Sequence, residues 1–123
     1  MLTLIAACGN NSNNNSNSDS SSTAVAPATN DITANPDYKK GLTLIAANDC
    51  LTCHKVDEKV TGPAYRDVAN KYENTDANVK MLAAKVIKGG SGNWGPVAMT
   101  PHPALSEADA EQMVKYVLLL RNK

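Results

Sequence analysis

The sequence contains no phenylalanine, and its 123 residues include only one tryptophan and four tyrosines. Aromatic side chains usually supply much of the buried area of a small core. A core this poor in large rings must either pack aliphatic side chains tightly or surround a bulky apolar group that the sequence does not encode. The second solution would also provide the extra stabilisation that a very small domain needs.

An excess of charge of one sign is also missing, because twelve basic and twelve acidic residues are mixed along the chain. A nucleic-acid partner would require clustered lysine and arginine. The sequence shows no sustained alternation of apolar and polar residues, which is the pattern of a half-buried strand. These absences exclude a nucleic-acid-binding role and favour an all-α domain.

Residues 1–8 form an apolar segment that ends in two alanines and Cys8, followed by Gly9. This ending resembles the acylation signal of bacterial lipoproteins. A complete export signal has a positively charged start and a longer apolar stretch, whereas only seven residues precede Cys8 and none of them is basic. The segment is therefore either a truncated signal or a chance match. The first alternative predicts a periplasmic protein anchored to a membrane as a lipoprotein through acylated Cys8.

Residues 9–35 consist largely of asparagine, serine and threonine. Such a composition cannot bury enough apolar surface to fold, so we expect a disordered tether. As a random coil it would span on the order of 30 Å. A tether that follows an acylation site would let a folded domain move clear of a membrane.

Residues 36–123 show helical patterns and form the predicted folded domain. Four or five short helices are expected, each with an apolar stripe and a recognisable start or stop signal. Met81 and Met113 fall on such stripes and are expected to fill the core. The predicted helices are residues 38–48 after Asn35 and Pro36, a helix opened by Pro63, residues 79–87 stopped by Gly89 and Gly90, and a helix capped by Ser106.

Cys50-Leu51-Thr52-Cys53-His54 is a C-x-x-C-H sequence, the attachment signature of c-type haem. Two cysteines three residues apart at the start of a helix can each form a thioether with one vinyl group of the haem. The next residue then directs its imidazole toward the iron from the same side. The motif therefore predicts one covalently attached haem c with His54 as an iron ligand.

Two other sites use similar residues. A thioredoxin-like dithiol also contains C-x-x-C but lies in a βαβ unit, and no such unit is predicted. A zinc site could combine Cys50, Cys53, His54 and His102. A zinc site would leave unexplained the long loop of residues 89–105, which contains four glycines and three prolines. Loops of this length are usually functional, and Met99, flanked by prolines within this one, is the expected second iron ligand.

Three segments in order, Cys50–His54, Thr61–Ala69 and Asn93–Met99, resemble the small bacterial class I cytochromes c. The resemblance covers residues 37–121 and implies the small cytochrome c fold, with His54 and Met99 as axial ligands of the iron. It further implies that the Pro63 carbonyl accepts a hydrogen bond from the His54 ring and that the Trp94 indole reaches a haem propionate.

Two residues near this predicted site need separate interpretation. Lys85 is a weaker candidate for a propionate contact, and we expect it on a solvated helix face. His102 stands where the family often carries asparagine, three residues after the ligand methionine. We interpret it as a loop histidine at the haem edge; the alternative is that its titration tunes the reduction potential or that it replaces Met99.

An iron with both axial positions filled has no open site for a substrate. The sequence also shows no nucleophile–base pair. The predicted function is therefore one-electron transfer in a respiratory chain, without enzymatic activity, by a monomer that docks to an upstream reductase and a terminal oxidase or reductase. The alternatives are a haem enzyme or small-ligand sensor with a labile Met99, and a subunit fused permanently to an oxidase.

Overall fold

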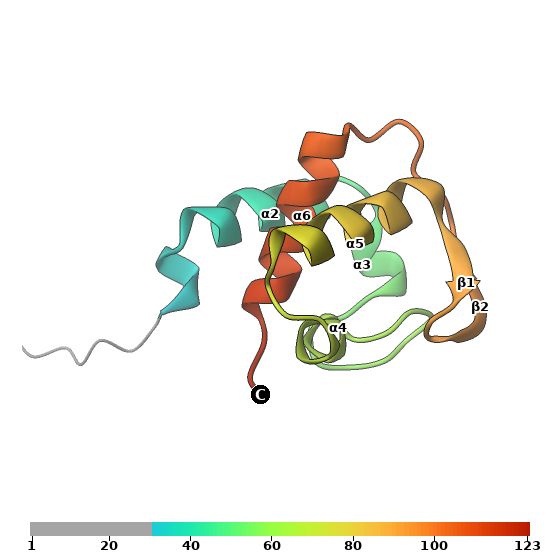
Figure 1. Cartoon of the computed structure of the whole chain (residues 1–123), viewed down its shortest axis with the longest axis horizontal. Helices are drawn as coiled ribbons and strands as arrows, with labels where there is room; N and C mark the ends of the chain where they lie inside the picture. Colours follow the sequence, from blue (N-terminus) through green and yellow to red (C-terminus); the bar gives the residue numbers. More distant parts are fainter. Residues whose placement is uncertain (1–30) are drawn as a thin grey trace, which may run out of the picture.

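A computed structural model describes residues 31–123 of the chain (Figure 1). The apolar segment with Cys8 and most of the predicted tether lie outside the described residues. The last residues of the predicted tether are described. Ile32–Ala34 forms a short 3-10 helix, η1, which the Asp31 side chain caps. Ile32 packs against the main core. The folded part of the chain therefore includes residues 31–35.

The centre of the fold is a close crossing of two helices, α2 (Pro36–Ala46) and α6 (Glu107–Leu119). Gly41 lies at the crossing, where an added Cβ would stand 2.3 Å from the Cβ of Tyr116. Only glycine allows the two backbones to approach this closely. The predicted cap of α2 is confirmed, since the Asn35 side chain accepts a hydrogen bond from the Asp37 amide and Pro36 opens the helix.

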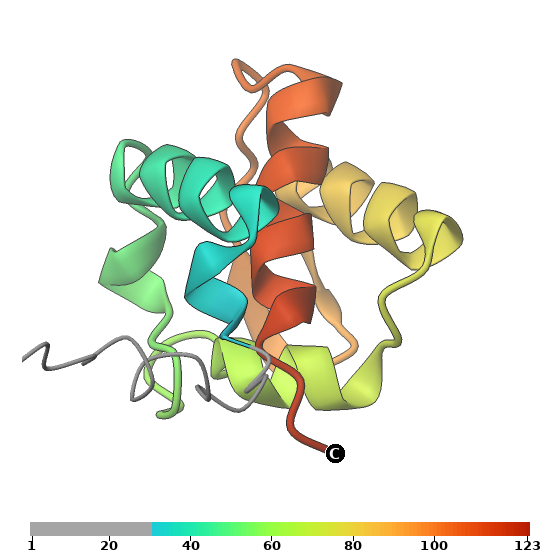
Figure 2. The same ribbon diagram turned by 90° about the vertical axis from the view of Figure 1, so that its left-hand side faces the viewer.

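The other helices pack around α6. Figure 2 shows α6 between α2 on one side and α5 (Asp76–Lys88) on the other, with α4 (Tyr65–Lys71) across one end. The core divides into two clusters, both of which include residues of α6. α3 (Cys50–Cys53) follows α2 directly. The predicted arrangement of four or five short helices is thus present.

Helix ends agree with the sequence signals at most positions. Gly89 ends α5 at a φ of 68°, and Ser106 caps α6. The start of α5 was not predicted: the helix begins at Asp76, before the predicted residues 79–87, and Thr75 caps it. The prediction that Pro63 opens a helix is wrong, because α4 begins two residues later at Tyr65. Pro63 instead lies in the preceding loop, where its carbonyl oxygen accepts a side-chain hydrogen bond.

The loop after α5 contains strands that the sequence did not predict. β1 (Gly90–Gly92) and β2 (Gly95–Met99) form an antiparallel hairpin in which Gly90 pairs with Met99. Neither strand has a fully buried residue, so neither shows the alternation that would reveal it. Figure 1 shows the hairpin running from the end of α5 to the level of α4.

Two further outcomes concern apolar residues. Met113 is buried as expected, but the same expectation is wrong for Met81, whose side chain is 46% exposed on α5.

Within residues 31–123, no helix combines the length and the apolar character that crossing a membrane would require.

Candidate functional site

The C-x-x-C-H motif forms a single tight helical turn. α3 contains both cysteines, and the His54 amide closes it by donating a hydrogen bond to the Cys50 carbonyl at 3.0 Å. Asp49 enters the turn with a left-handed φ of 48°. Both thiols are half-buried and free of disulfide bonding among the described residues. The turn therefore presents two sulfur atoms and an imidazole next to one another.

The His54 ring is held in one tautomer. Its Nδ1 lies 2.8 Å from the Pro63 carbonyl oxygen, and because a carbonyl can only accept, Nδ1 carries the proton. The lone pair of Nε2 is therefore free to bind a metal ion, which is the usual arrangement of a ligating histidine. This is the hydrogen bond that the resemblance implies.

Gly62 and Tyr65 fix the orientation of the same ring. A Cβ at Gly62 would lie 2.5 Å from Cε1 of His54, so the backbone at this position lies directly against the imidazole. The ring of Tyr65 stacks on His54 with centroids 5.0 Å apart and planes at 19°. Tyr65 is buried, and that burial raises the pKa of its phenol above the ordinary value. The helical pattern of the sequence carried no signal for this contact.

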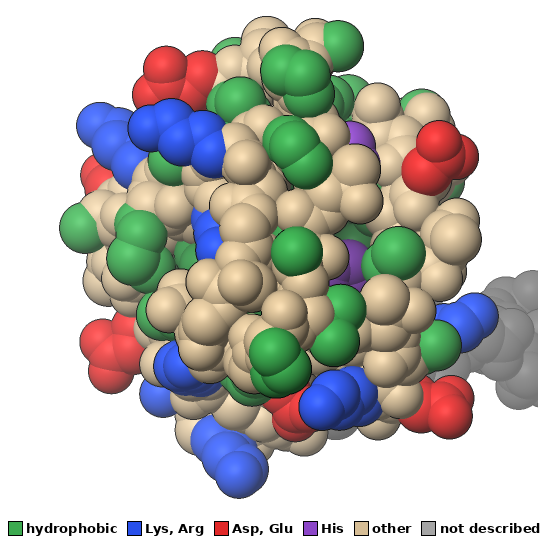
Figure 3. Space-filling view, turned by 90° about the vertical axis from the view of Figure 1, so that its right-hand side faces the viewer, with side chains coloured by type: hydrophobic (Ala, Val, Ile, Leu, Met, Phe, Trp, Pro, Cys, Tyr) green, Lys and Arg blue, Asp and Glu red, His purple; other side chains and the backbone are tan. Residues whose placement is uncertain are grey.

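These groups line a cavity of about 550 Å³. α3, the loop before α4, α5, the hairpin and α6 all contribute to its wall. Figure 3 shows the hairpin face of the molecule, where histidine atoms are visible in hollows between hydrophobic side chains and most charged side chains lie around the edge. The predicted site residues that line the cavity are Cys50, Cys53, His54, Pro63, Trp94 and Met99.

Met99 reaches this cavity from the last position of β2. Its side chain is half-buried, and its backbone pairs with Gly90 at the base of the hairpin. A Cβ at Gly89, where α5 ends, would lie 2.4 Å from the Met99 carbonyl oxygen. The glycine that stops α5 is thus also the glycine that allows the segment carrying Met99 to return close to the helix.

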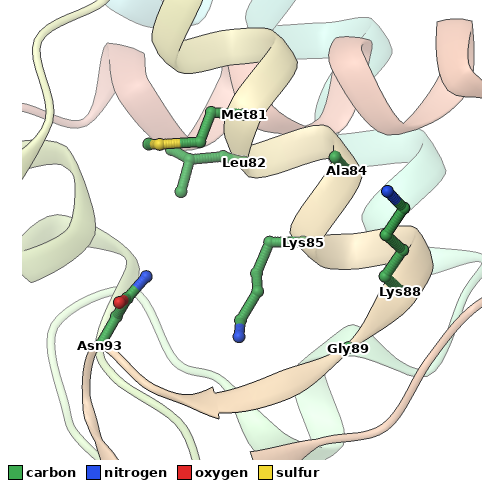
Figure 4. Close-up of a pocket in the computed structure, with 7 residues that line it drawn as sticks. All are labelled: Met81, Leu82, Ala84, Lys85, Lys88, Gly89 and Asn93. Carbon is green, nitrogen blue, oxygen red and sulfur yellow. The ribbon is translucent and has the colours of Figure 1, made fainter.

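Lys85 differs from the expectation of a solvated helix face. Its side chain is half-buried and lines the main cavity. It also lines a smaller adjoining cavity of about 240 Å³ between α5 and Asn93. Figure 4 shows Lys85 directed toward the hairpin, whereas Lys88 points away from the gap. The cavity therefore has a cationic group on its wall in addition to its apolar lining.

His102 lines the same cavity and is tied to α5. Its amide donates to the Ile87 carbonyl at 3.0 Å, and its Nδ1 lies 3.3 Å from the Val86 carbonyl oxygen. Both contacts fasten the loop that follows β2 to the end of the helix. This position agrees with the prediction that His102 is a loop histidine at the edge of the site.

The zinc alternative does not fit the geometry. Among residues 31–123, no three histidine, cysteine or acidic side chains lie close enough together to hold a metal ion. Burial also raises the pKa of the Cys50 thiol, which opposes the thiolate form that zinc requires. No βαβ unit exists in this part of the chain, which also excludes the thioredoxin-like arrangement.

The same residues fit a haem. The cavity is mainly apolar and within the size range of cofactor pockets. Two free thiols line it, and the backbone of Gly62 leaves room only for the imidazole beside it. The missing aromatic residues of the core are thus matched by a space that a flat apolar cofactor can fill.

Comparisons with known proteins agree with this geometry. The family described as Cytochrome c matches residues 38–121. Cytochrome c-551 of Allochromatium vinosum is 40% identical over 87 residues, covering 71% of this chain and 93% of that protein. Cytochrome c-552 of Nitrosomonas europaea is 41% identical over 78 residues, covering 63% of this chain and 76% of that protein.

The fold is also similar to solved structures. The crystal structure of wild-type Nitrosomonas europaea cytochrome c552 aligns with a TM-score of 0.61 and 40% sequence identity. The alignment covers 64% of this chain and 98% of that chain.

Proposed function

The chain belongs to the cytochrome c family, as a small class I member with one haem c bound covalently through Cys50 and Cys53, and from this premise we propose that it is a one-electron carrier. The proposed axial ligands are His54 and Met99. The haem supplies the reversible redox chemistry, and the chain's own residues hold it in place, set its potential and exclude other reactions.

One observation carries the proposal: His54 and Met99, which are far apart in sequence, line the same cavity. His54 has its proton on Nδ1, bound by Pro63, so that Nε2 is available. A methionine thioether is a soft ligand that raises the reduction potential of a c-type haem. With both positions filled, no open coordination site would remain for a substrate, which supports a carrier rather than an enzyme.

The wall of the cavity supports two further assignments. We propose that the Trp94 indole donates to a haem propionate and that Lys85 pairs with the propionate charge. Both side chains line the cavity, and Lys85 is directed toward the hairpin (Figure 4). A cation there would offset the negative charge that the propionates bring into a half-buried site.

The proposed partners are redox proteins that dock transiently as part of a respiratory chain. The hairpin face supports this proposal, because exposed apolar side chains such as Val97 lie beside the cavity and charged groups lie around them (Figure 3). Acylation of Cys8 would hold a monomeric domain at a membrane in the periplasm, with residues 9–30 as the tether. Copurification with an oxidase through high salt would instead identify a permanent subunit.

The absorption spectrum of the ferric holoprotein tests the ligation. We expect a weak red charge-transfer band from methionine bound to ferric iron, and its loss in Met99→Ala. Met81→Ala is the matched control, because Met81 is exposed on α5 and does not line the main cavity. A high-spin ferric spectrum in the unmodified protein, or ready binding of carbon monoxide to its ferrous form, would contradict the proposal and favour an enzyme or sensor.

A further inference from the structure

The hairpin that carries Met99 is attached unevenly. Its base is fastened to α5, through Gly89 on one side and His102 on the other. Along residues 90–99, one hydrogen bond joins the hairpin to another element that the structure describes: Lys71 Nζ donates to the Asn93 carbonyl at 3.2 Å. This bond lies at the turn, the end farthest from the base.

Lys71 makes a second contact at the same place. Its ammonium group lies 4.5 Å from the centroid of the Trp94 ring, within the range of a cation–π interaction. Asn93 and Trp94 are consecutive residues between β1 and β2. One cation therefore binds both the backbone and the aromatic side chain of the hairpin turn.

The position of Lys71 on α4 connects these contacts to the His54 ring. Lys71 is the last residue of α4, and Tyr65, the first residue, stacks on His54. α4 thus contacts the imidazole at one end and the hairpin turn at the other. Lys80 offers a comparison, because it is an exposed lysine on α5 with no such pair of contacts.

We propose that Lys71 is a positioning residue that latches the hairpin over the cavity and so keeps Met99 at the iron. The proposal rests on the ligation proposed above. Without the Lys71 cation, the turn would lose the one described hydrogen bond that joins it to another element of the protein, and the hairpin would open more often at that end. Each opening increases the exposure of Trp94, which is 38% exposed in the closed hairpin, and allows an external ligand to replace Met99.

The test uses the ferric holoprotein of the full chain. Imidazole is the probe, and its binding is followed by the loss of the red methionine band. For Lys71→Gln we expect binding about 5- to 70-fold faster than in the unmodified protein, the range for losing an exposed cation–π contact together with its hydrogen bond. Lys71→Arg should restore most of the original rate, because arginine also presents a cation to the ring and the carbonyl.

Fluorescence gives an independent readout, since Trp94 is the only tryptophan of the chain. Energy transfer to the nearby haem should quench it in the closed state, and Lys71→Gln should increase its emission. Lys80→Gln is the matched control for loss of one exposed positive charge. It should leave the imidazole rate and the emission unchanged.

Two results would overturn the latch: an imidazole rate in Lys71→Gln equal to that of the unmodified protein, or the same acceleration in Lys80→Gln. If the unmodified protein lacks the red band, the ligation proposal fails instead. The latch is then decided by emission alone, which must rise in Lys71→Gln and not in Lys80→Gln.

Discussion

Gly62→Ala tests whether the backbone beside His54 fixes the imidazole. The added Cβ would lie 2.5 Å from Cε1, 2.8 Å from Nδ1 and 3.0 Å from Nε2 of His54. Ordinary contacts of a Cβ begin at 3.4 Å, so the ring or the Gly62–Pro63 backbone must move. The obstacle is a ring, which cannot turn aside as the end of a flexible side chain can.

The ring has little freedom to move. Its Nδ1 is bound to Pro63 at 2.8 Å, and its face stacks on buried Tyr65. A shift large enough to relieve the clash must lengthen that hydrogen bond or displace Tyr65. Overpacking of this kind costs about 1 to 3 kcal/mol. For a domain of this size, each kcal/mol lowers the midpoint of thermal unfolding by about 4 to 8 °C.

Thermal unfolding of the holoprotein, followed by circular dichroism, measures this loss. The absorption spectrum should change in parallel, because the same shift misdirects Nε2. Val60→Ala is the control, since Val60 lies in the same loop, is 46% exposed and does not line the cavity. A Gly62→Ala protein with an unchanged midpoint and spectrum would refute the claim that this backbone positions His54.

Two further predictions concern pH. Burial raises the pKa of Tyr65 above the ordinary value of a tyrosine. Above about pH 10 the phenol therefore loses its proton in the unfolded chain but keeps it in the folded protein. The free energy of unfolding should then fall by up to about 1.4 kcal/mol per pH unit. Denaturant titrations of Tyr65→Phe should show a shallower alkaline loss; an identical slope would contradict this account. Because Nδ1 of His102 lies 3.3 Å from the Val86 carbonyl, we expect a structural role, so the reduction potentials of the unmodified protein and His102→Asn should follow the same course between about pH 5 and 8. A pH-dependent potential that disappears in His102→Asn would show instead that this histidine tunes the iron.

The sequence determined the local features whose causes are local. Asn35, Thr75 and Ser106 cap helices because each side chain can satisfy a free amide two or three residues ahead. The C-x-x-C-H spacing placed two thiols on one helical turn and the imidazole on the residue that directly follows it, because these five residues are consecutive in the chain. The lack of aromatic residues left two alternatives open, tight aliphatic packing or a core completed by a group from outside the chain, and the haem of the cytochrome c family corresponds to the second.

Only the tertiary structure decided the contacts between segments distant in sequence. The hairpin has no buried strand residue to reveal it. Met81 and Met113 both lie on helical apolar stripes, yet only Met113 is buried. The approach of Gly62 to His54 and the contact of Lys71 with Trp94 depend on how α4 packs against α6 and where the hairpin returns. Periodicity specifies which face of a helix is apolar, but not which surface covers it. That choice is made by the packing of the whole chain.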